Sequence, residues 1–577
     1  MKSTTKKVSR PAKRKAGEQS PKKASEAKET SAVEQVEPTT SRSKRVKHEL
    51  LSQANYIPKF AADRVLSCGE GPQLGHPGRN TTKKPRHVTE LPEGLKFSQA
   101  VAGGVHSFLL TTDGQVYGCG VNEKGTVPVE DVEREETTDE FKLLQFPDSL
   151  KKHGKIVMLA AGASFTAALT ENGTVYAWGN LRDASGNIDS HTILQDMQKE
   201  PTLINNYKST HVVKIAAGEN HLLMLSNNGE VLSFGDGTQG QLGRTMRTSH
   251  IRSNYMVDSS GNARRLVINL REKARKENKA VDIMAGGYWS MVKVEDGRWF
   301  AFGLNNYGQL GVPLPKEAEE PSTAGDKMQA DETDYHVYLP TLAPEYGSVG
   351  DITHIQGVHH TVCRSADGTV HAMGKNTDNA LGLDTWTGND DNDHWRYTSL
   401  QKVPVPLAEG DQIVGVTATI GCSIAWTQNG DAYAWGCDTV GQLGLGISDG
   451  DVIPSPEKIT SAHLEGFKIV SVSIADTHAL LLATKREEED VPLLLLLLFL
   501  LNVIADCGCG SRCHEYSYAL HCARCCSATV RRRSVRPETS ELHVGQNRER
   551  LEDDAFYGLF LDLLNRNRRL NPRFYRS

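Results

Sequence analysis

The sequence predicts an all-β fold, a seven-bladed β-propeller whose ring is closed by pairing of the N- and C-terminal strands. The first observation is a short alternating strand that recurs seven times and ends at Gly69, Gly120, Gly179, Gly235, Gly303, Gly374 and Gly436. The second is another apolar strand that also recurs seven times, as in AGGVHSFLL and AGENHLLML. Repeats of 51 to 71 residues built from short strands are typical of propeller blades around a central channel. The 52 glycines among 577 residues favour such a turn-rich fold over a helical bundle.

The N-terminal residues 1–55 are expected to form a disordered basic arm. Residues 1–50 carry 14 Lys and Arg against 6 Asp and Glu and show no apolar periodicity. Such a segment cannot bury enough apolar surface to offset its ordering entropy. It also shows no apolar run of the kind that a secretory signal needs. Residues 51–484 carry 37 Lys and Arg against 52 Asp and Glu, so a basic arm suited to polyanions precedes an acidic body.

Six of the second strands run into the next glycine-ended strand through an Asp-Gly or Asn-Gly pair. The glycines of these pairs are Gly114, Gly173, Gly229, Gly297, Gly368 and Gly430. Such dipeptides readily adopt the positive φ angles of a type I′ turn, which suits a tight hairpin. We therefore expect a type I′ hairpin in each of these repeats.

The phase of the repeats predicts how the ring closes within residues 56–484. The first strand, 64–69, has no hairpin partner upstream, and the last, 469–484, has none downstream. If the two ends share one blade, two exposed sheet edges disappear together. The alternative, an open solenoid, would need capping repeats, which the sequence lacks.

Smaller features of the repeats have structural interpretations. The GQLG-type loops, such as 240–244 and 441–446, are expected to be turns with a leucine packed between blades, in preference to ligand sites. Cys68, Cys119, Cys363, Cys422 and Cys437 have no metal-ligand spacing and are expected to be small buried hydrophobes.

The repeat pattern xxAGxxHxxxLxxxGxVYxWGxxxxGQLG resembles that of the regulator of chromosome condensation family, over about 51–484. The founding member of that family is the nuclear exchange factor for the Ran GTPase. The resemblance implies a chromatin-bound, nuclear and monomeric exchange factor whose partners are Ran, nucleosomal histones and DNA, and importin, with no membrane and no cofactor. The same propeller also occurs in ubiquitin ligases and trafficking regulators, so a scaffold role stays open.

The family forms a β-wedge after its third repeat, and the sequence here, Gly179-Asn180-Leu181-Arg182-Asp183-Ala184-Ser185-Gly186, is similar. An ordinary long loop is the alternative for this segment. Histidines recur at one repeat position, where a hydrogen-bonded structural role at a blade edge is favoured for most of them and partner contact stays open for the four named below. The resemblance implies GTPase contacts at Leu181, Arg182, Asp183, Ala184, Ser185, Gly186, Glu219, Asn220, His221, His106, Arg244, His359 and His360.

Two basic segments are similar to chromatin- and import-related parts of the family. The long loop after Arg244 has an arginine, Arg252, where the family inserts one into the acidic patch of the nucleosome; guanidinium groups suit clustered carboxylates. The expected nucleosome contacts are Arg247, Arg252, Arg264 and Arg265. The expected import and DNA contacts are Lys13, Arg14, Lys15, Lys44, Arg45 and Lys47.

The resemblance implies an exchange factor without covalent chemistry, and the sequence agrees by omission. It contains no GxxxxGK[ST], no HExxH and no GxSxG motif. It also departs from the family, which has aspartate and histidine where this chain has Ala163 and Phe165, and an aspartate where it has Asn220. A chromatin-binding propeller that lacks exchange activity is therefore the alternative function.

The tail, 485–577, differs in composition from the repeats. Its apolar run, 491–505, is shorter than the ~20 residues of a membrane span. Six cysteines between 507 and 526 match no zinc-finger spacing. A translated non-coding or mis-spliced segment is the favoured interpretation; a zinc site and a tail anchor stay open, and no metal site is predicted.

Overall fold

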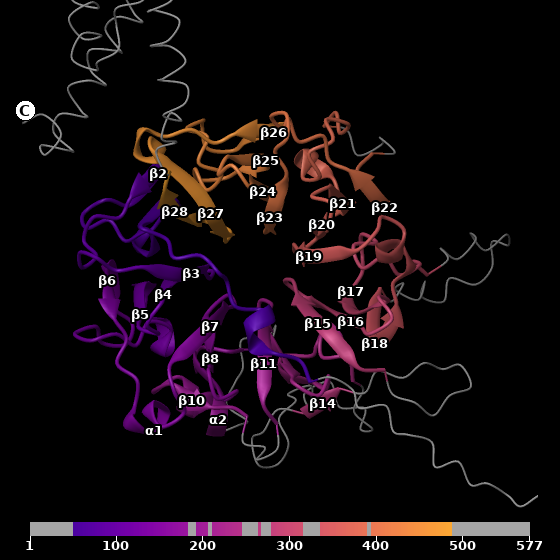
Figure 1. Ribbon diagram of the computed structural model, residues 1–577. Helices are drawn as coiled ribbons and strands as arrows, with labels where there is room; N and C mark the ends of the chain where they lie inside the picture. Colours follow the sequence, from indigo (N-terminus) through magenta and orange to yellow (C-terminus); the bar gives the residue numbers. More distant parts are fainter. Residues whose placement is uncertain are drawn as a thin grey trace, which may run out of the picture. The chain divides into compact units, whose positions relative to one another are not determined.

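The computed structural model describes residues 50–182, 192–205, 210–244, 264–266, 278–315, 335–388 and 394–486, with only the backbone at 264–266. The chain divides into two units after Thr484. The first unit contains seven four-stranded antiparallel sheets arranged as the blades of a ring (Figure 1). The first strand of each blade lies nearest the centre of the ring. The predicted seven-bladed propeller is confirmed.

The blades are numbered from the first complete repeat. Blade 1 contains β3 (Phe97–Ala102), β4 (His106–Thr111), β5 (Val116–Val121) and β6 (Thr137–Leu143). Blade 2 contains β7 (Ile156–Ala161), β8 (Phe165–Thr170), β9 (Val175–Gly179) and β10 (Thr202–Leu203). Blade 3 contains β11 (Val212–Ala217), β12 (His221–Ser226), β13 (Val231–Gly235) and β14 (Arg264–Leu266). Blade 4 contains β15 (Ala280–Ala285), β16 (Trp289–Val294), β17 (Trp299–Leu304) and β18 (His336–Leu342).

The remaining blades follow the same order. Blade 5 contains β19 (Ile352–Gln356), β20 (His360–Ser365), β21 (Val370–Lys375) and β22 (Arg396–Lys402). Blade 6 contains β23 (Ile413–Ala418), β24 (Cys422–Thr427), β25 (Ala432–Asp438) and β26 (Asp451–Lys458). Blade 7 contains β27 (Phe467–Ile474), β28 (His478–Lys485), β1 (Arg64–Glu70) and β2 (Thr81–His87). Two short helices lie in blade connections, α1 (Asp148–Lys151) and α2 (Thr192–Met197), together with 3₁₀ turns that include η1 (Gln53–Asn55), η2 (Pro72–Leu74) and η7 (Ala462–Leu464).

Blade 7 closes the ring in the predicted way. Strand β1 pairs antiparallel with β28, from Arg64 opposite Ala483 to Gly69 opposite His478. The two ends of the propeller sequence therefore share one sheet, and neither leaves an unpaired inner edge. This pairing excludes the open solenoid.

The Asp-Gly and Asn-Gly turns form hairpins, but the predicted turn type is wrong. A type I′ turn needs positive φ at both central residues, whereas here only the glycine is left-handed, with φ of 93° at Gly114. Gly114 N donates to Thr111 O, and Thr111 N donates to Gln115 O. This pattern is a three-residue loop, a type I turn followed by a left-handed glycine, because one more residue separates the strands than we expected.

The seven glycines that end the third strands are required by close backbone contact. Their φ angles lie between 96° and 121°. A Cβ atom at any of them would lie 2.2–2.7 Å from a carbonyl oxygen of the turn before the second strand. The next residue donates to that same carbonyl, as Asn180 N does to Ser164 O at 2.6 Å. The strand-ending glycine of the repeat therefore fastens the loop after the third strand to the turn before the second.

The GQLG-type loops act as structural turns, as expected. Their leucines, Leu74, Leu242, Leu310, Leu381 and Leu443, are at most 1% exposed. Among the five cysteines of the described blades, all are free thiols and four are buried, while Cys437 is half-buried. The expectation of buried small hydrophobes is thus confirmed for four of them.

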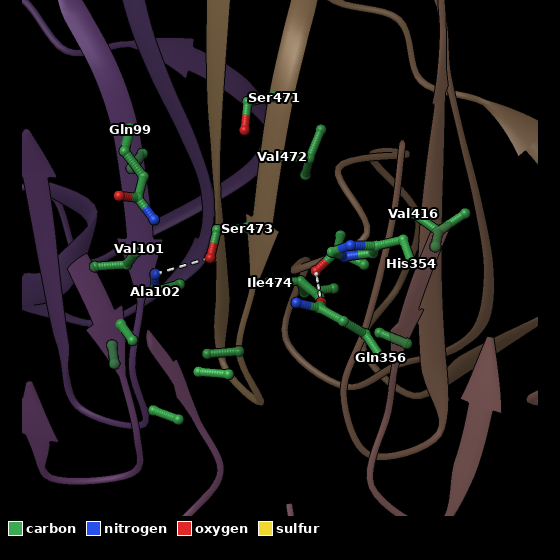
Figure 2. A pocket seen from close by; sticks show the side chains of 18 of the residues that line it. Gln99, Val101, Ala102, His354, Gln356, Val416, Ser471, Val472, Ser473 and Ile474 are labelled. Atoms are coloured by element: carbon green, nitrogen blue, oxygen red, sulfur yellow. Dashed lines mark hydrogen bonds between the residues drawn. The ribbon is translucent and has the colours of Figure 1, made fainter. Parts of the chain in front are cut away.

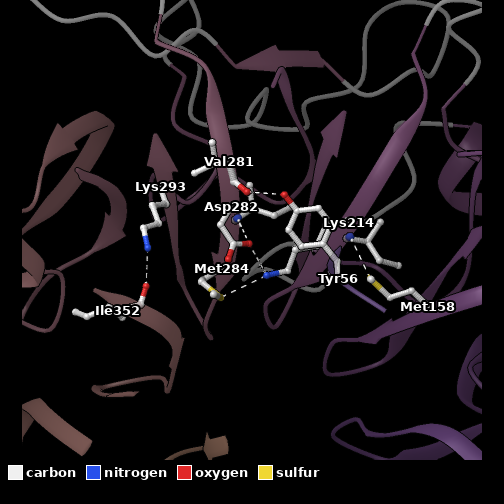
Figure 3. A network of polar contacts seen from close by, with 10 residues as sticks. Tyr56, Met158, Lys214, Val281, Asp282, Met284, Lys293 and Ile352 are labelled. Carbon is white, nitrogen blue, oxygen red and sulfur yellow. Dashed lines mark hydrogen bonds and ion pairs between the residues drawn. The ribbon is translucent and has the colours of Figure 1, made fainter. Parts of the chain in front are cut away.

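Residues 50–62 form a strap across one face of the ring. The Gln53 side chain donates to Thr170 O of blade 2 and to Val212 O of blade 3, at 2.9 and 3.1 Å. Tyr56 Oη donates to Val281 O of blade 4 at 2.6 Å (Figure 3). Ala62 then pairs with Phe97 at the start of blade 1. The strap therefore links four blades before the chain enters blade 7.

The strap also borders a central channel of about 760 Å³, lined by the first strands of all seven blades. Polar side chains join neighbouring strands around its wall. Ser473 Oγ accepts from Ala102 N at 3.0 Å, and Thr417 Oγ1 donates to Gln356 Oε1 at 2.9 Å (Figure 2). Lys214 Nζ lies 2.6 Å from Asp282 Oδ1, beside the ring of Tyr56 (Figure 3). Burial beside this aspartate raises the pKa of Tyr56 to about 12.

Candidate protein-binding face

The two faces of the ring are distinguished by their turns. The Asp-Gly and Asn-Gly hairpin turns and the strap lie on one face, called here the hairpin face. The turns between first and second strands lie on the other, called the AG-turn face, and comprise 103–105, 162–164, 218–220, 286–288, 357–359, 419–421 and 475–477. The loops after the third strands reach the same face. Most of the predicted GTPase contacts belong to these turns and loops.

The segment expected to form a wedge leaves the AG-turn face at the end of β9. Leu181 is only 1% exposed and packs in a cluster with Phe165 and Phe234. The expectation that Leu181 contacts a partner directly is therefore corrected, since its side chain anchors the segment to blades 2 and 3. Arg182 is half-buried, and its Nη1 lies 3.5 Å from Glu123 Oε1. Asp183, Ala184, Ser185 and Gly186 lie outside the described residues.

Asn220 contacts the base of this segment. With its amide nitrogen turned toward two carbonyls, it donates to Arg182 O and to Glu219 O, each at 3.3 Å. An aspartate here would place a carboxylate oxygen against the same carbonyls and could not donate to either. The amide therefore suits this arrangement and positions Arg182.

Glu219 lies at the mouth of the channel, near Asp476 of blade 7. Burial and the Asp476 carboxylate raise the pKa of Glu219 to about 7. The backbone of Glu219 also bridges three blades, because its carbonyl accepts from Ala163 N and its amide donates to Gly287 O, both at 2.9 Å. Thr419 donates to Asp476 from blade 6. The Glu219 carboxyl is therefore readily protonated near neutral pH, beside the carboxylate of Asp476.

Three of the predicted histidines are interblade contacts. His106, His221 and His360 are 0% exposed. His221 Nε2 lies 2.9 Å from Ser290 Oγ of the next blade, and that hydroxyl donates to Gln241 O at 2.8 Å. His221 Nε2 must therefore carry the proton and donate to the serine. Burial lowers the pKa of His221 to about 3, so the ring is neutral. The expected direct partner contact of these three histidines is corrected to the structural alternative.

His359 and Arg244 are placed differently. His359 is half-buried on the AG-turn face, and its ring packs between Tyr288 and Tyr307, with centroids 6.5 and 5.5 Å away. Burial, and then Lys375, lower its pKa. Arg244 folds back on β13, where its guanidinium donates to the hydroxyl and carbonyl of Ser233. Of this pair, His359 keeps part of its surface exposed on the AG-turn face, and Arg244 fixes the start of its loop.

Comparison with known proteins shows which family the chain belongs to. The family model described as RCC1-like domain matches residues 64–481. The regulator of chromosome condensation of Xenopus laevis is 31% identical over 430 residues, which cover 73% of this chain and 90% of that protein. The chain belongs to the regulator of chromosome condensation family. The guanine nucleotide exchange factor SRM1 of Saccharomyces cerevisiae is 24% identical, covering 71% of this chain and 83% of that protein.

A solved structure agrees on the fold. Prp20p from Saccharomyces cerevisiae, which was studied for its binding properties to Gsp1p and histones, has a TM-score of 0.62 and 22% identity, covering 78% of this chain and 99% of that one. By contrast, the probable E3 ubiquitin-protein ligase HERC6 of Homo sapiens is 24% identical, but the match covers only 32% of its length.

The departure from the family pattern at Phe165 is matched in the neighbouring blade. Where most blades pair a histidine with a Ser or Thr of the next blade, blade 2 offers Phe165 and blade 3 offers Leu222, both fully buried in one cluster. Cys422 and Ala479 form the corresponding apolar pair of blades 6 and 7. In blade 4, Trp289 Nε1 donates to Val358 O instead. Phe165 is therefore a packing substitution, and Leu222 compensates for the lost histidine.

Sequence reasoning missed two residues of the AG-turn face. Asp476 occupies the same repeat position as Glu219, and Tyr288 the same position as Asn220 and His359. Burial and the carboxylates of Glu219, Asp476 and Asp236 raise the pKa of Tyr288. Aligning all seven turns by their distance from the second strand would have found both.

The remaining predicted contacts lie outside the described residues. These are Arg247, Arg252, Lys13, Arg14, Lys15, Lys44, Arg45 and Lys47, while Arg264 and Arg265 are described only as backbone of β14. The cysteine cluster of the tail is also outside. Within the described ranges, no helix is long and apolar enough to cross a membrane. The described residues also contain no group of three or more His, Cys, Asp or Glu placed to hold a metal ion.

Proposed function

We propose that this protein is a guanine nucleotide exchange factor for a Ran-type GTPase and acts through its AG-turn face. The observation that carries the proposal is the match to curated relatives over nearly their whole length, 90% of the Xenopus regulator and 83% of the exchange factor SRM1. The placement of Arg182, Glu219, Asn220 and His359 in the turns and loops of the AG-turn face supports it.

The proposed activity needs no nucleophile. A GTPase holds its nucleotide through backbone amides, a lysine and Mg²⁺. An exchange factor that binds the nucleotide-free form more tightly than the nucleotide-bound form lowers the barrier to release. The rigid ring provides a preformed surface, and the segment from Arg182 to Gly186 is the proposed wedge. Asn220 holds the start of that segment from blade 3.

We propose in addition that the protein acts in the nucleus on chromatin. The arm residues Lys13 to Lys15 and Lys44 to Lys47 would serve importin recognition and DNA contact, and Arg252 would bind the nucleosome. The basic arm ahead of an acidic body supports this assignment. Replacement of Arg252 by glutamate is expected to weaken nucleosome binding at least tenfold in a gel-shift titration while GDP release stays unchanged. Equal affinity of the variant would exclude the arginine contact.

The test of exchange is release of labelled GDP from Ran by the full chain. Arg182→Glu and Asp183→Ala are each expected to lower kcat/KM by about tenfold or more, a loss of about 1.4 kcal/mol in transition-state stabilisation. Arg298→Glu is the matched control, because Arg298 is a half-buried arginine of a hairpin turn on the opposite face, paired with Asp296 of the same turn.

Release that is no faster than the uncatalysed rate, from a folded protein that still binds nucleosomes, would contradict the proposal. That result would favour the second candidate, a chromatin-binding propeller without exchange activity. The neutral residues Ala163 and Asn220, where the family has acids, are the observation that favours this candidate.

A further inference from the structure

The outer rim of blade 7 carries a cluster of cations on an otherwise acidic propeller. Residues 64–87 contain five Lys and Arg against a single acid, Glu70, whereas 51–484 as a whole carry 37 against 52. The rim cluster is defined here as Arg79, Lys84, Arg86, His87 and His463. Its members come from the loop before β2, from β2 itself and from η7.

The pairing of β2 places these residues together. Arg86 lies opposite Ser67 and His87 opposite Leu66, in the outermost strand of the sheet. His463 is tied to the same blade because its carbonyl accepts from Arg64 Nη1 at 2.7 Å. Arg79, Lys84 and Arg86 are exposed, and His87 and His463 are half-buried. The cations thus form an extended row along an exposed strand edge and do not converge on a pocket.

The three exposed cations of the rim cluster form no ion pairs within the described part of the chain. Lys83 pairs with Asp449 at 3.1 Å, and the Arg64 guanidinium stacks 3.6 Å from the centre of the Phe467 ring. Among the described residues, no ion pair involves Arg79, Lys84 or Arg86. The positive charge of this group also affects a buried histidine, His76. Burial, followed by Arg86, Arg79, His463 and His87, lowers the pKa of the buried His76 to about 4.

We propose that the rim cluster binds the phosphate backbone of double-stranded DNA, in addition to the arm. A row of unpaired cations spread over a strand, a loop and a 3₁₀ turn suits an extended polyanion, since phosphate contacts need charge and spacing but no pocket. The acidic remainder of the propeller would repel DNA elsewhere and so direct it to this rim. The surface is formed by the outermost strand of blade 7 and by η7, whereas Arg182, Glu219 and Asn220 belong to blades 2 and 3, and it does not depend on exchange activity.

The test is a fluorescence-anisotropy titration of the full chain with a labelled DNA duplex at several salt concentrations. The rim variant is Arg79→Gln/Lys84→Gln/Arg86→Gln. Each lost phosphate contact lowers the slope of log K against log salt by about 0.9, so the slope should fall by about 2–3. Affinity at 0.1 M salt should fall by about tenfold or more.

The matched control is Lys59→Gln/Lys152→Gln/Lys402→Gln, which removes the same charge from three exposed lysines outside blade 7. It is expected to keep the slope of the unaltered protein, and both variants to keep its melting temperature and GDP release. If the rim and control variants had the same slope of log K against log salt, the proposal would be overturned. The cations would then serve only to protect the exposed strand edge from aggregation. The proposal would also be overturned if the rim variant kept its binding to the duplex but lost binding to a phosphoserine peptide, because the rim would then be a phosphopeptide site.

Discussion

At the residue scale, neighbouring blades are joined by one pair of positions that accepts two kinds of chemistry. The first residue of a second strand meets the second residue of the same strand in the next blade. Where the first is His106, His221, His360 or His478, the partner is Thr166, Ser290, Ser423 or Ser107. Where the first is Phe165 or Cys422, the partner is Leu222 or Ala479, and the pair is apolar. Each histidine Nε2 therefore meets a hydroxyl and each apolar side chain meets another apolar one, because a lone buried polar group would be costly.

This pairing predicts strong coupling between Phe165 and Leu222. Phe165→His alone is expected to lower the free energy of unfolding by about 3 kcal/mol, because a buried imidazole would face a leucine. Adding Leu222→Ser should restore about 1–2 kcal/mol of that loss by providing an acceptor. Denaturant unfolding of the two single variants and the double variant measures the coupling. Strictly additive losses would refute the paired interpretation.

Glu219 predicts a pH dependence of stability. Its folded-state pKa is raised to about 7, above the value of an unfolded glutamate, so the folded state binds the extra proton between about pH 4.5 and 7. Stability therefore falls as pH rises through this window. Glu219→Gln removes the buried charge and should raise stability by about 1–2 kcal/mol at pH 8 with little effect at pH 4.5.

Thermal melts at both pH values test this prediction. Glu171→Gln, at an exposed glutamate of a hairpin turn, serves as the control and should show no such difference. An equal shift of the Glu219 variant at the two pH values would rule out the proposed titration.

At the element scale, the strap shows how a segment without a blade of its own stabilises the ring. Its hydrogen bonds run from Gln53 and Tyr56 to backbone carbonyls that belong to blades 2, 3 and 4. These carbonyls lie at or near strand ends on the hairpin face. The strap therefore acts across blades, while the strands act mainly within them.

Removing the strap contacts should destabilise the whole propeller. Gln53→Ala/Tyr56→Phe deletes three hydrogen bonds and should lower the free energy of unfolding by about 2–3 kcal/mol. Gln412→Ala/Tyr338→Phe changes the same residue types at exposed sites and should cost less than about 1 kcal/mol. Chemical denaturation followed by tryptophan fluorescence compares them. If both variants lost the same free energy of unfolding, the strap contacts would contribute no more to stability than exposed side chains do.

At the scale of the whole molecule, stability depends on closing the ring in blade 7. Leu480, Leu481 and Leu482 of β28 are fully buried, and full burial of one leucine is worth about 1.5–3 kcal/mol. A chain that ends at residue 466 loses β27 and β28 together, which exposes the edge of β1. The free energy of burial lost with these two strands is comparable to the whole free energy of unfolding of a typical domain, about 5–15 kcal/mol.

Two truncations test the closure. A chain ending at residue 486 keeps every described strand and is expected to melt within a few degrees of the full chain. A chain ending at residue 466 is expected to be unfolded or aggregated at 25 °C by circular dichroism and gel filtration. A cooperative melt of the shorter chain near the temperature of the longer one would contradict the need for closure.

The sequence by itself determined the blade count, the closing pair of strands and the buried leucines, because each rests on a local pattern repeated in register. Local patterns were enough for these features because a few consecutive residues show both the apolar alternation of a strand and the glycine that a left-handed turn position requires. The turn type escaped prediction because Asp-Gly fits two hairpin loops that differ by one residue. The family resemblance supplied the functional expectation that the comparisons then supported at the level of family membership.

Only the tertiary structure decided where the candidate residues lie and what they contact. It buried Leu181, His106, His221 and His360 in packing that the repeat pattern could not distinguish from exposed positions. It brought Asp476 to Glu219 and Leu222 to Phe165, although these pairs belong to different blades. It also gathered the cations of β2 and η7, which lie more than 370 residues apart in the chain. Such contacts depend on how the ring closes, and no short stretch of sequence contains that information.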